Sequence, residues 1–93
     1  MGKFAPLSAI HRRRIVDPNG AHVGHIHDVL LDLRDGRIEY VCIALEDTTR
    51  SDAPEVVVPW SALRARGEGT SDWEIAAGKR LLQDIAQPAS SRG

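Results

Sequence analysis

The stretch Val56-Val57-Val58-Pro59-Trp60-Ser61-Ala62-Leu63 decides the fold of this chain. Three β-branched residues in a row predict a short and fully apolar strand. Pro59 ends that strand, because its nitrogen has no hydrogen to donate at the next ladder position. Trp60 and Leu63 follow at a spacing that lets one tight turn place both against the same core. The stretch therefore predicts a buried strand that ends in a plug, with Trp60 as the main plugging side chain.

Two turn sequences upstream divide the chain into hairpins. The first is Asp17-Pro18-Asn19-Gly20 and the second is Asp35-Gly36. Both supply residues that adopt the backbone angles of tight turns at little cost. They separate three predicted strands, over residues 13–16, 23–33 and 38–45.

The predicted strand over residues 23–33 breaks the two-residue alternation of a regular strand. Ile26 and Val29 are three residues apart, so they cannot share a face unless an extra residue is inserted. We therefore expect a bulge near Gly24 or at His27-Asp28, of the kind that bends the strands of small barrels. Such a bulge would turn four apolar side chains inward: Ile26, Val29, Leu31 and Leu33.

The C-terminal part of the chain is predicted to add one short strand and one helix. Trp73 and Ile75 alternate as they would in a strand. Residues 77–86 show helical periodicity, which Pro88 ends. Residues 88–93 are small and polar, and we expect them to form a frayed tail.

Three blocks of this sequence together resemble the PRC-barrel family: Gly20–Asp32, Asp35–Val41 and Val56–Leu63. This small β-barrel is also found in the photosynthetic reaction centre H subunit and in a ribosome maturation factor. The resemblance covers about residues 5–87 of a single domain that spans residues 1–93. It implies an all-β barrel of about five or six mostly antiparallel strands, here with a short C-terminal helix. It also implies roles in protein contact and assembly, with no catalysis and no cofactor.

Charge is unevenly distributed along the 93 residues, although the net charge is only −1. Residues 1–25 carry a net charge of +3, residues 26–78 of −6, and residues 79–93 of +2. No global field therefore draws the chain to nucleic acid or acidic lipid. Cys42 is the single cysteine, which excludes an internal disulfide and favours a reducing cytoplasm. No apolar run is long enough for direct membrane insertion.

The predicted strand over residues 38–45 is apolar on both faces. One face carries Ile38, Tyr40, Cys42 and Ala44, and the other carries Val41, Ile43 and Leu45. A barrel of this size buries only one of them internally, so the other needs the helix or a second subunit as a cover. We therefore predict a two-fold homodimer with an interface drawn from six residues: Val41, Ile43, Leu45, Leu81, Leu82 and Ile85.

Two histidines are the candidates for a metal site. His25 and His27 lie two apart, on the same face of a regular strand, and imidazole is a good ligand for zinc, copper or nickel. No cysteine lies near them, and a third ligand would have to come from a turn. We therefore interpret both as solvent-facing residues on the outside of the barrel and predict no metal.

A basic run, Arg12-Arg13-Arg14, is the candidate contact for an acidic partner. Such runs meet phosphates, but aromatic residues for base stacking do not interleave with this one. The other interpretation is a solvated edge strand whose charges block edge pairing. Asp28 and Asp32 lack the cleft and nucleophile that a carboxylate-based enzyme requires, and Asp28 is instead expected to bind backbone at the bulge.

The sequence thus predicts a non-enzymatic, stand-alone interaction module that forms a homodimer or docks an unidentified protein partner. The alternative is an accessory of ribosome assembly or RNA processing that contacts ribosomal protein or RNA. A metal-binding sensor that uses His25 and His27 is the third hypothesis. Salt separates the first two, because phosphate contacts weaken steeply with salt and apolar contacts do not.

Overall fold

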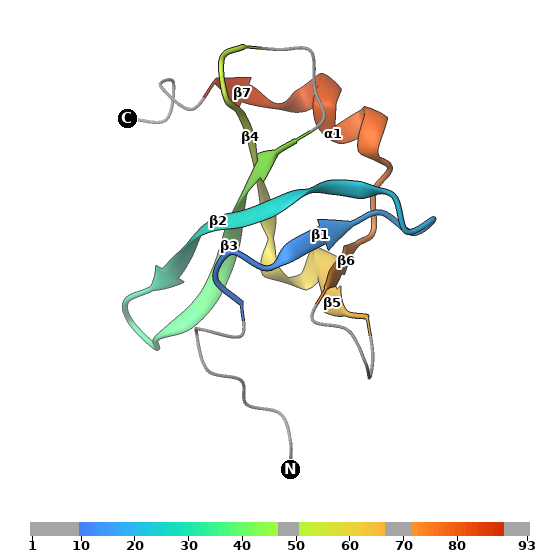
Figure 1. The fold of residues 1–93 in the computed structure, drawn as a ribbon. Helices are drawn as coiled ribbons and strands as arrows, with labels where there is room; N and C mark the ends of the chain where they lie inside the picture. The colour runs from blue at the N-terminus through green and yellow to red at the C-terminus, as the bar shows by residue number, and fades with distance from the viewer. Residues whose placement is uncertain (1–9, 47–50, 67–71, 89–93) are drawn as a thin grey trace.

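The computed structural model describes residues 10–46, 51–66 and 72–88. Seven strands form one sheet in the order β5-β6-β1-β2-β3-β4-β7. Figure 1 shows this sheet curled into a barrel-like shape, with β7 and the helix at one end. The elements are β1 (Arg14–Val16), β2 (His22–Asp32), β3 (Arg37–Leu45), β4 (Pro54–Pro59), the 3-10 helix η2 (Trp60–Ala62), β5 (Leu63–Ala65), β6 (Trp73–Ile75), α1 (Lys79–Ile85) and β7 (Gln87–Pro88).

The architecture confirms the predicted all-β fold with a short C-terminal helix. All neighbouring strands pair antiparallel, except that β1 and β6 are parallel. The strand count exceeds five or six because β5 and β7, of three and two residues, also join the sheet. Elements this short carry too little sequence pattern to be recognised before the fold is known.

Both predicted turns are present, and a register shift occurs at each of the two places where the bulge was expected. Gly20 and Gly36 adopt positive φ angles of 84° and 73°. The register of β1 against β2 shifts beside Gly24, and that of β2 against β3 shifts where His27 is inserted. Position 24 has no room for a side chain, because a Cβ atom there would lie 2.0 Å from the carbonyl oxygen of Ala44. The two strands approach too closely for any side chain.

The core lies inside the curled sheet, and its largest fully buried side chains are isoleucines and one leucine: Ile15, Ile26, Ile43, Ile75 and Leu82. Trp60 is only half-buried and rests against the edge of this core. Its ring meets that of Trp73 with centroids 5.1 Å apart and planes tilted by 49°. The prediction of Trp60 as the main plug is therefore wrong, because the aliphatic side chains fill the interior and leave one side of the ring uncovered.

The structure also decides which face of β3 points inward. Val41, Ile43 and Leu45 are buried within a single chain, as is Leu82 of the helix. Their expected place on a subunit interface is wrong. Val41 and Ile43 face inward because they pair with apolar residues of β2 and β4 on the inner face of the sheet. Leu81 and Ile85 are exposed, as an interface would require.

The outer halves of β2 and β3 form a hairpin that extends beyond the neighbouring strands β1 and β4. We call residues 28–40 the hairpin arm. β1 pairs with β2 only up to His25, and β4 pairs with β3 only from Tyr40. Figure 1 shows this hairpin projecting to one side of the sheet. Leu31 and Leu33, which were expected inside, are 49% and 91% exposed. No other strand in the described ranges pairs with the arm beyond these points.

In the described part of the chain, no helix has the length and apolar character needed to cross a membrane.

Candidate interaction surface

The hairpin arm exposes apolar side chains on both of its faces. Leu30 and Tyr40 are cross-strand partners on one face, and Leu31 and Ile38 are partners on the other. Leu33 lies at the turn between the two strands. Clustered exposed apolar residues on a small soluble domain are typical of contact surfaces. The arm is therefore the first candidate for a functional surface.

An open groove of about 340 Å³ lies where the arm joins the sheet. Apolar, aromatic and polar side chains all contribute to its lining. The lining residues are Ile38, Tyr40, Pro59 and Trp60, with Arg37, Glu39 and Ser61. The register that places Tyr40 opposite Pro59 brings β3 and η2 together at this point. The groove is suited to one branched aliphatic side chain from a partner.

Charged residues at the tip of the arm are arranged in local pairs. Arg34 binds Asp32 through a nitrogen at 2.8 Å and Nε at 3.1 Å. These side-chain bonds are the main cause of a lowered pKa for Asp32, and a bond from the Arg34 backbone lowers it further. The same carboxylate raises the pKa of Arg34. Arg37 lies 3.8 Å from Asp35. Charged residues thus flank Leu33 at the tip of the arm.

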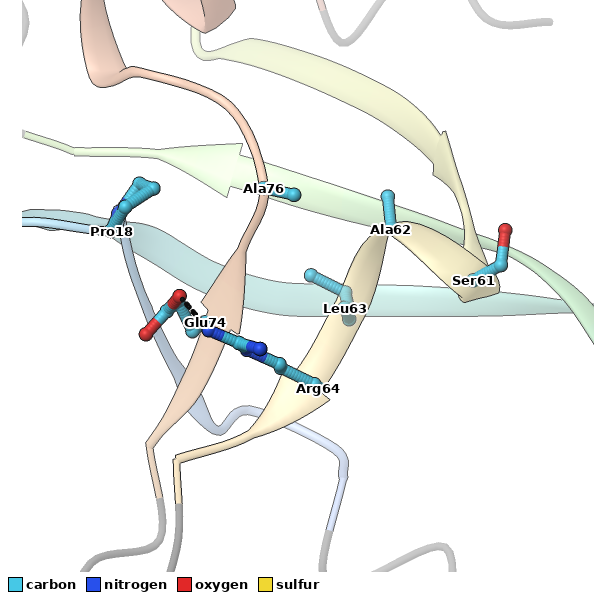
Figure 2. Close-up of a pocket in the computed structure, with 7 residues that line it drawn as sticks. All are labelled: Pro18, Ser61, Ala62, Leu63, Arg64, Glu74 and Ala76. Carbon is cyan, nitrogen blue, oxygen red and sulfur yellow. Dashed lines mark hydrogen bonds and ion pairs between the residues drawn. The ribbon is translucent and has the colours of Figure 1, made fainter.

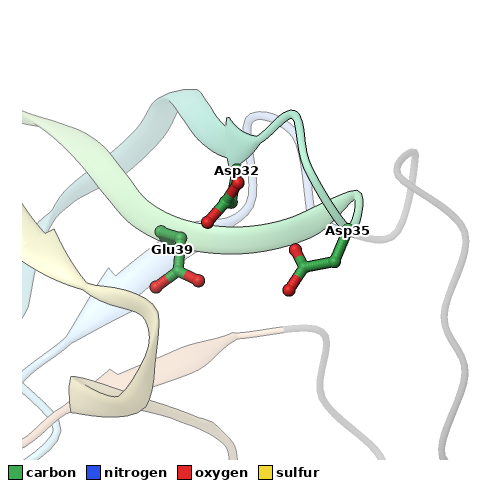
Figure 3. Close-up of side chains that lie close together, drawn as sticks. All are labelled: Asp32, Asp35 and Glu39. Atoms are coloured by element: carbon green, nitrogen blue, oxygen red, sulfur yellow. The ribbon is translucent and has the colours of Figure 1, made fainter.

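Three carboxylates of the arm come close together. Figure 3 shows Asp32, Asp35 and Glu39 converging, and one oxygen from each lies within 4.8 Å of the others. Within the described ranges, this is the one group of three potential metal ligands whose atoms lie this close together. All three carboxylates are on a solvated hairpin, and Arg34 and Arg37 partly neutralise them. Their local effect is a concentration of negative charge beside the groove.

The two histidines that were the metal candidates lie beside different carboxylates. His25 Nδ1 lies 3.5 Å from Glu46, and His27 Nε2 lies 3.6 Å from Glu55. His22 is instead the neighbour of His25, with Nε2 at 2.7 Å from the other Glu46 oxygen. His25 pairs with Ala44 and Ala44 pairs with Glu55, so the register places His25 on the same side of the sheet as the carboxylate that His27 approaches. The two imidazoles nevertheless contact different carboxylates.

Glu55 is a buried carboxylate between a thiol and an imidazole. The Cys42 thiol donates to Glu55 Oε1 at 3.3 Å, and the other oxygen faces His27. Cys42 is fully buried, which confirms its prediction as a small core residue. Asp28, beside His27, accepts a bond from the Val29 N–H at 2.9 Å, so it binds backbone at the bulge as predicted, although on the surface. This cluster ties β2, β3 and β4 together.

The basic run reaches a shallow depression on the outside of the sheet. Arg12 and Arg14 line it together with His22, His25 and Glu46, and its volume is about 380 Å³. Arg14 binds Asp72 at 3.2 Å, whereas Arg13 has a buried Nε with no partner in the described residues. Arg12 has a positive φ of 63°, which is uncommon for a residue other than glycine. Two members of the run, Arg12 and Arg14, thus line the same depression.

A further pocket of about 300 Å³ lies between β5 and β6, near Pro18. Figure 2 shows Arg64 and Glu74 at its edge, joined by a bond of 3.0 Å. Ser61 also contributes to the lining, and η2 has no side-chain capping bond. The charged groups of this pocket are satisfied by each other, and they orient β5 against β6.

Comparison with known proteins agrees with the fold. The PRC-barrel domain matches residues 4–79, which is most of the chain. The chain belongs to the PRC-barrel family. No curated protein matches it. The match includes the whole hairpin arm and the groove, whereas most of α1 and all of β7 follow it. The arm is therefore part of the PRC-barrel itself.

Sequence reasoning missed the groove and assigned the arm leucines to the interior. One signal was available: the predicted strands 23–33 and 38–45 are much longer than the strands 13–16 and 56–58 that flank them. Long strands beside short ones must leave an overhang. In this PRC-barrel the overhang is the arm, and its apolar residues are surface residues for that reason.

Proposed function

We propose that this PRC-barrel is a non-catalytic interaction module that associates with a second copy of itself through the hairpin arm. The exposure of Leu30, Leu31, Leu33 and Tyr40 on one projecting element carries the proposal. Burying such side chains removes apolar area from water, which is the main driving force of association. The family's character as an interaction domain also supports this function.

Charge on the arm favours a second copy as the partner. The arm carries cations and carboxylates side by side, with Arg34 and Arg37 among the Asp32, Asp35 and Glu39 carboxylates. A two-fold contact brings each charge against the same element of the other copy, so a mixed pattern can complement itself. A strongly basic or strongly acidic partner would be repelled by half of these groups.

Catalysis receives little support from the same geometry. The single thiol, Cys42, is fully buried, where a substrate has no access. In the described ranges, His22, His25 and His27 each face a carboxylate. An imidazole and a carboxylate without a nucleophile or a metal do not assemble a hydrolytic site.

Sedimentation equilibrium over a wide concentration range tests the proposal. We expect a reversible dimer, and we expect Leu31→Glu to weaken it because the new charge must be desolvated in the contact. Leu81→Glu is the matched control, since Leu81 is similarly exposed but lies on α1, away from the arm. A chain that stays monomeric contradicts the proposal. A dimer that only Leu81→Glu disrupts would place the contact on the helix.

The depression lined by Arg12 and Arg14 supports RNA binding as a second candidate function. It gathers two guanidinium groups and two imidazoles on one face, a composition suited to phosphate. Filter binding with ribosomal RNA should then show an affinity that falls steeply with salt. The double variant Arg12→Glu, Arg14→Glu should abolish it, and binding unaffected by that change would exclude this surface.

A further inference from the structure

We propose that Leu33 at the arm tip of one copy inserts into the Tyr40–Trp60 groove of a second copy, and that the second copy does the same in return. This inference rests on the proposed self-association and names its contact. It requires an exposed apolar side chain, a groove that accepts it, and charges that match around both. The chain supplies all three on one hairpin.

The inserting side chain is presented on a rigid turn. Leu33 is the most exposed large hydrophobic residue in the described part of the chain. The Asp32 carboxylate accepts the Arg34 backbone N–H at 2.9 Å, and the Asp32 carbonyl accepts the Gly36 N–H at 2.7 Å. A side chain held in place before binding loses less conformational entropy when it is buried.

The groove has the character of a binding hot spot. Tyr40 and Trp60 provide two large, stiff aromatic surfaces, and Pro59 and Ile38 complete the apolar lining. Trp60 is braced from behind by Trp73. Aromatic pockets that are already formed are the usual sites where a single inserted side chain contributes most of the affinity. Leu33 cannot occupy the groove of its own copy, because it is almost wholly exposed.

The charges around the groove point to the arm tip as its occupant. Glu39 on the rim has no cationic partner in the described residues, and its carboxylate lies near those of Asp32 and Asp35. An incoming cation would relieve this repulsion. Arg34 stands next to Leu33. It binds Asp32 of its own copy, but its side chain is 90% exposed, so the tip that carries the leucine also carries a cation that a second carboxylate can approach.

A two-fold axis makes the contact reciprocal. Two arms lying antiparallel place the tip of each against the base of the other, where the groove lies. Simple pairing of the free β2 edges is disfavoured, because a pairing centred on Leu30 would set Asp28 opposite Asp32 of the other copy. Like charges directly opposite destabilise a strand pair. The arms therefore meet through side chains and do not extend the sheet.

Directed cross-linking tests the geometry. A mixture of the Leu33→Cys and Ser61→Cys variants should form a disulfide between the two copies under mild oxidation. Ser61 lines the groove and is exposed, so an introduced thiol can be reached. Leu81→Cys mixed with Ser61→Cys is the control and should give no such product. Native Cys42 is buried and does not compete.

Affinity measurements give an independent readout. Leu33→Ser should raise the dimer dissociation constant by about a hundred-fold, because each dimer loses two buried leucine contacts. Tyr40→Ser should act in the same direction, and Leu33→Met should retain most of the affinity. Circular dichroism checks that the monomers remain folded.

The outcomes separate this inference from the proposal beneath it. If the parent chain dimerises but Leu33→Ser has no effect and no cross-link forms, the insertion of Leu33 into the groove is wrong while self-association stands. If the parent chain is monomeric at every concentration, both are wrong. A cross-link together with a weakened Leu33→Ser dimer supports both.

Discussion

The inner and outer halves of β2 and β3 are built from similar residues and have opposite environments. Ile26 and Ile43 of the inner half are wholly buried, whereas Leu31 of the outer half is half exposed. The inner half has β1 on one side and β4 on the other, and the outer half has neither. An apolar strand pair thus becomes core only where further strands curl over it. Elsewhere the same composition makes a contact surface.

The charged residues of the two halves show the same contrast. Glu55, beside the inner half, is buried and faces Cys42 and His27. Asp32, on the outer half, is only partly exposed and pairs with Arg34, whose side chain is 90% exposed. A buried carboxylate must be satisfied by the protein, whereas an exposed one is satisfied by water as well. The inner charges are therefore expected to affect stability, and the outer ones the proposed association.

The largest expected difference is between apolar truncations in the two halves. Ile43→Ala should lower the free energy of unfolding by about 2–5 kcal/mol, because it removes buried methyl groups and leaves a cavity. Leu31→Ala should change it by less than about 1 kcal/mol, since the side chain is half solvated. Urea denaturation at low protein concentration measures both. Similar losses at the two positions would show that the arm is part of the core.

Gly24→Ala should be the next most damaging change. The added methyl group would meet the Ala44 carbonyl, and the β2–β3 pairing must shift to relieve the overlap. We expect a loss of about 1–3 kcal/mol in the same denaturation assay. Gly78→Ala is the matched control, because open space surrounds that position and its φ is −70°. A tolerated Gly24→Ala would mean that the inner strands are less closely packed than described.

Removal of the buried carboxylate should have an intermediate effect. Glu55→Ala leaves the Cys42 thiol and its neighbours without their acceptor, at an expected cost of about 1–3 kcal/mol. Glu39→Ala on the arm should leave the stability of the monomer unchanged within about 0.5 kcal/mol. Thermal melts of the two variants side by side provide the measurement. If Glu39→Ala proved the more costly, the contrast between the two halves would fail.

The smallest expected effect concerns pH. The Arg34 side chain and then its backbone lower the pKa of Asp32, so the ionised carboxylate favours the folded state. Its contribution is present above the pKa of Asp32 in the unfolded chain and is lost as pH falls through the lower folded value. Asp32→Asn should therefore flatten the acid limb of stability slightly below about pH 4. Salt should shrink the difference, because this pair is exposed. A difference between the two chains that stayed unchanged as pH fell through the range in which Asp32 becomes protonated would contradict the assignment.

Local chemistry predicted much of this fold. The glycines of both turns, the proline after three valines and the broken alternation around His27 are short-range signals, and each appears in the structure where expected. The positions of Leu33 and Trp60 were not predictable in this way. Whether either is covered depends on strands that lie far away in the sequence. The groove was missed for the same reason, because it joins β3 to η2.

The sequence by itself determined that this chain is a small β-barrel with two tight hairpins, one bulged strand and a helix at its C-terminal end. Turn residues, β-branched runs and period-two alternation act through neighbours in the chain, so they can be recognised without a structure. Only the tertiary structure decided which face of β3 became core and which half of the hairpin stayed in water. Both depend on where β1 and β4 stop pairing, and burial is set by all the strands that surround a residue and not by its own alone.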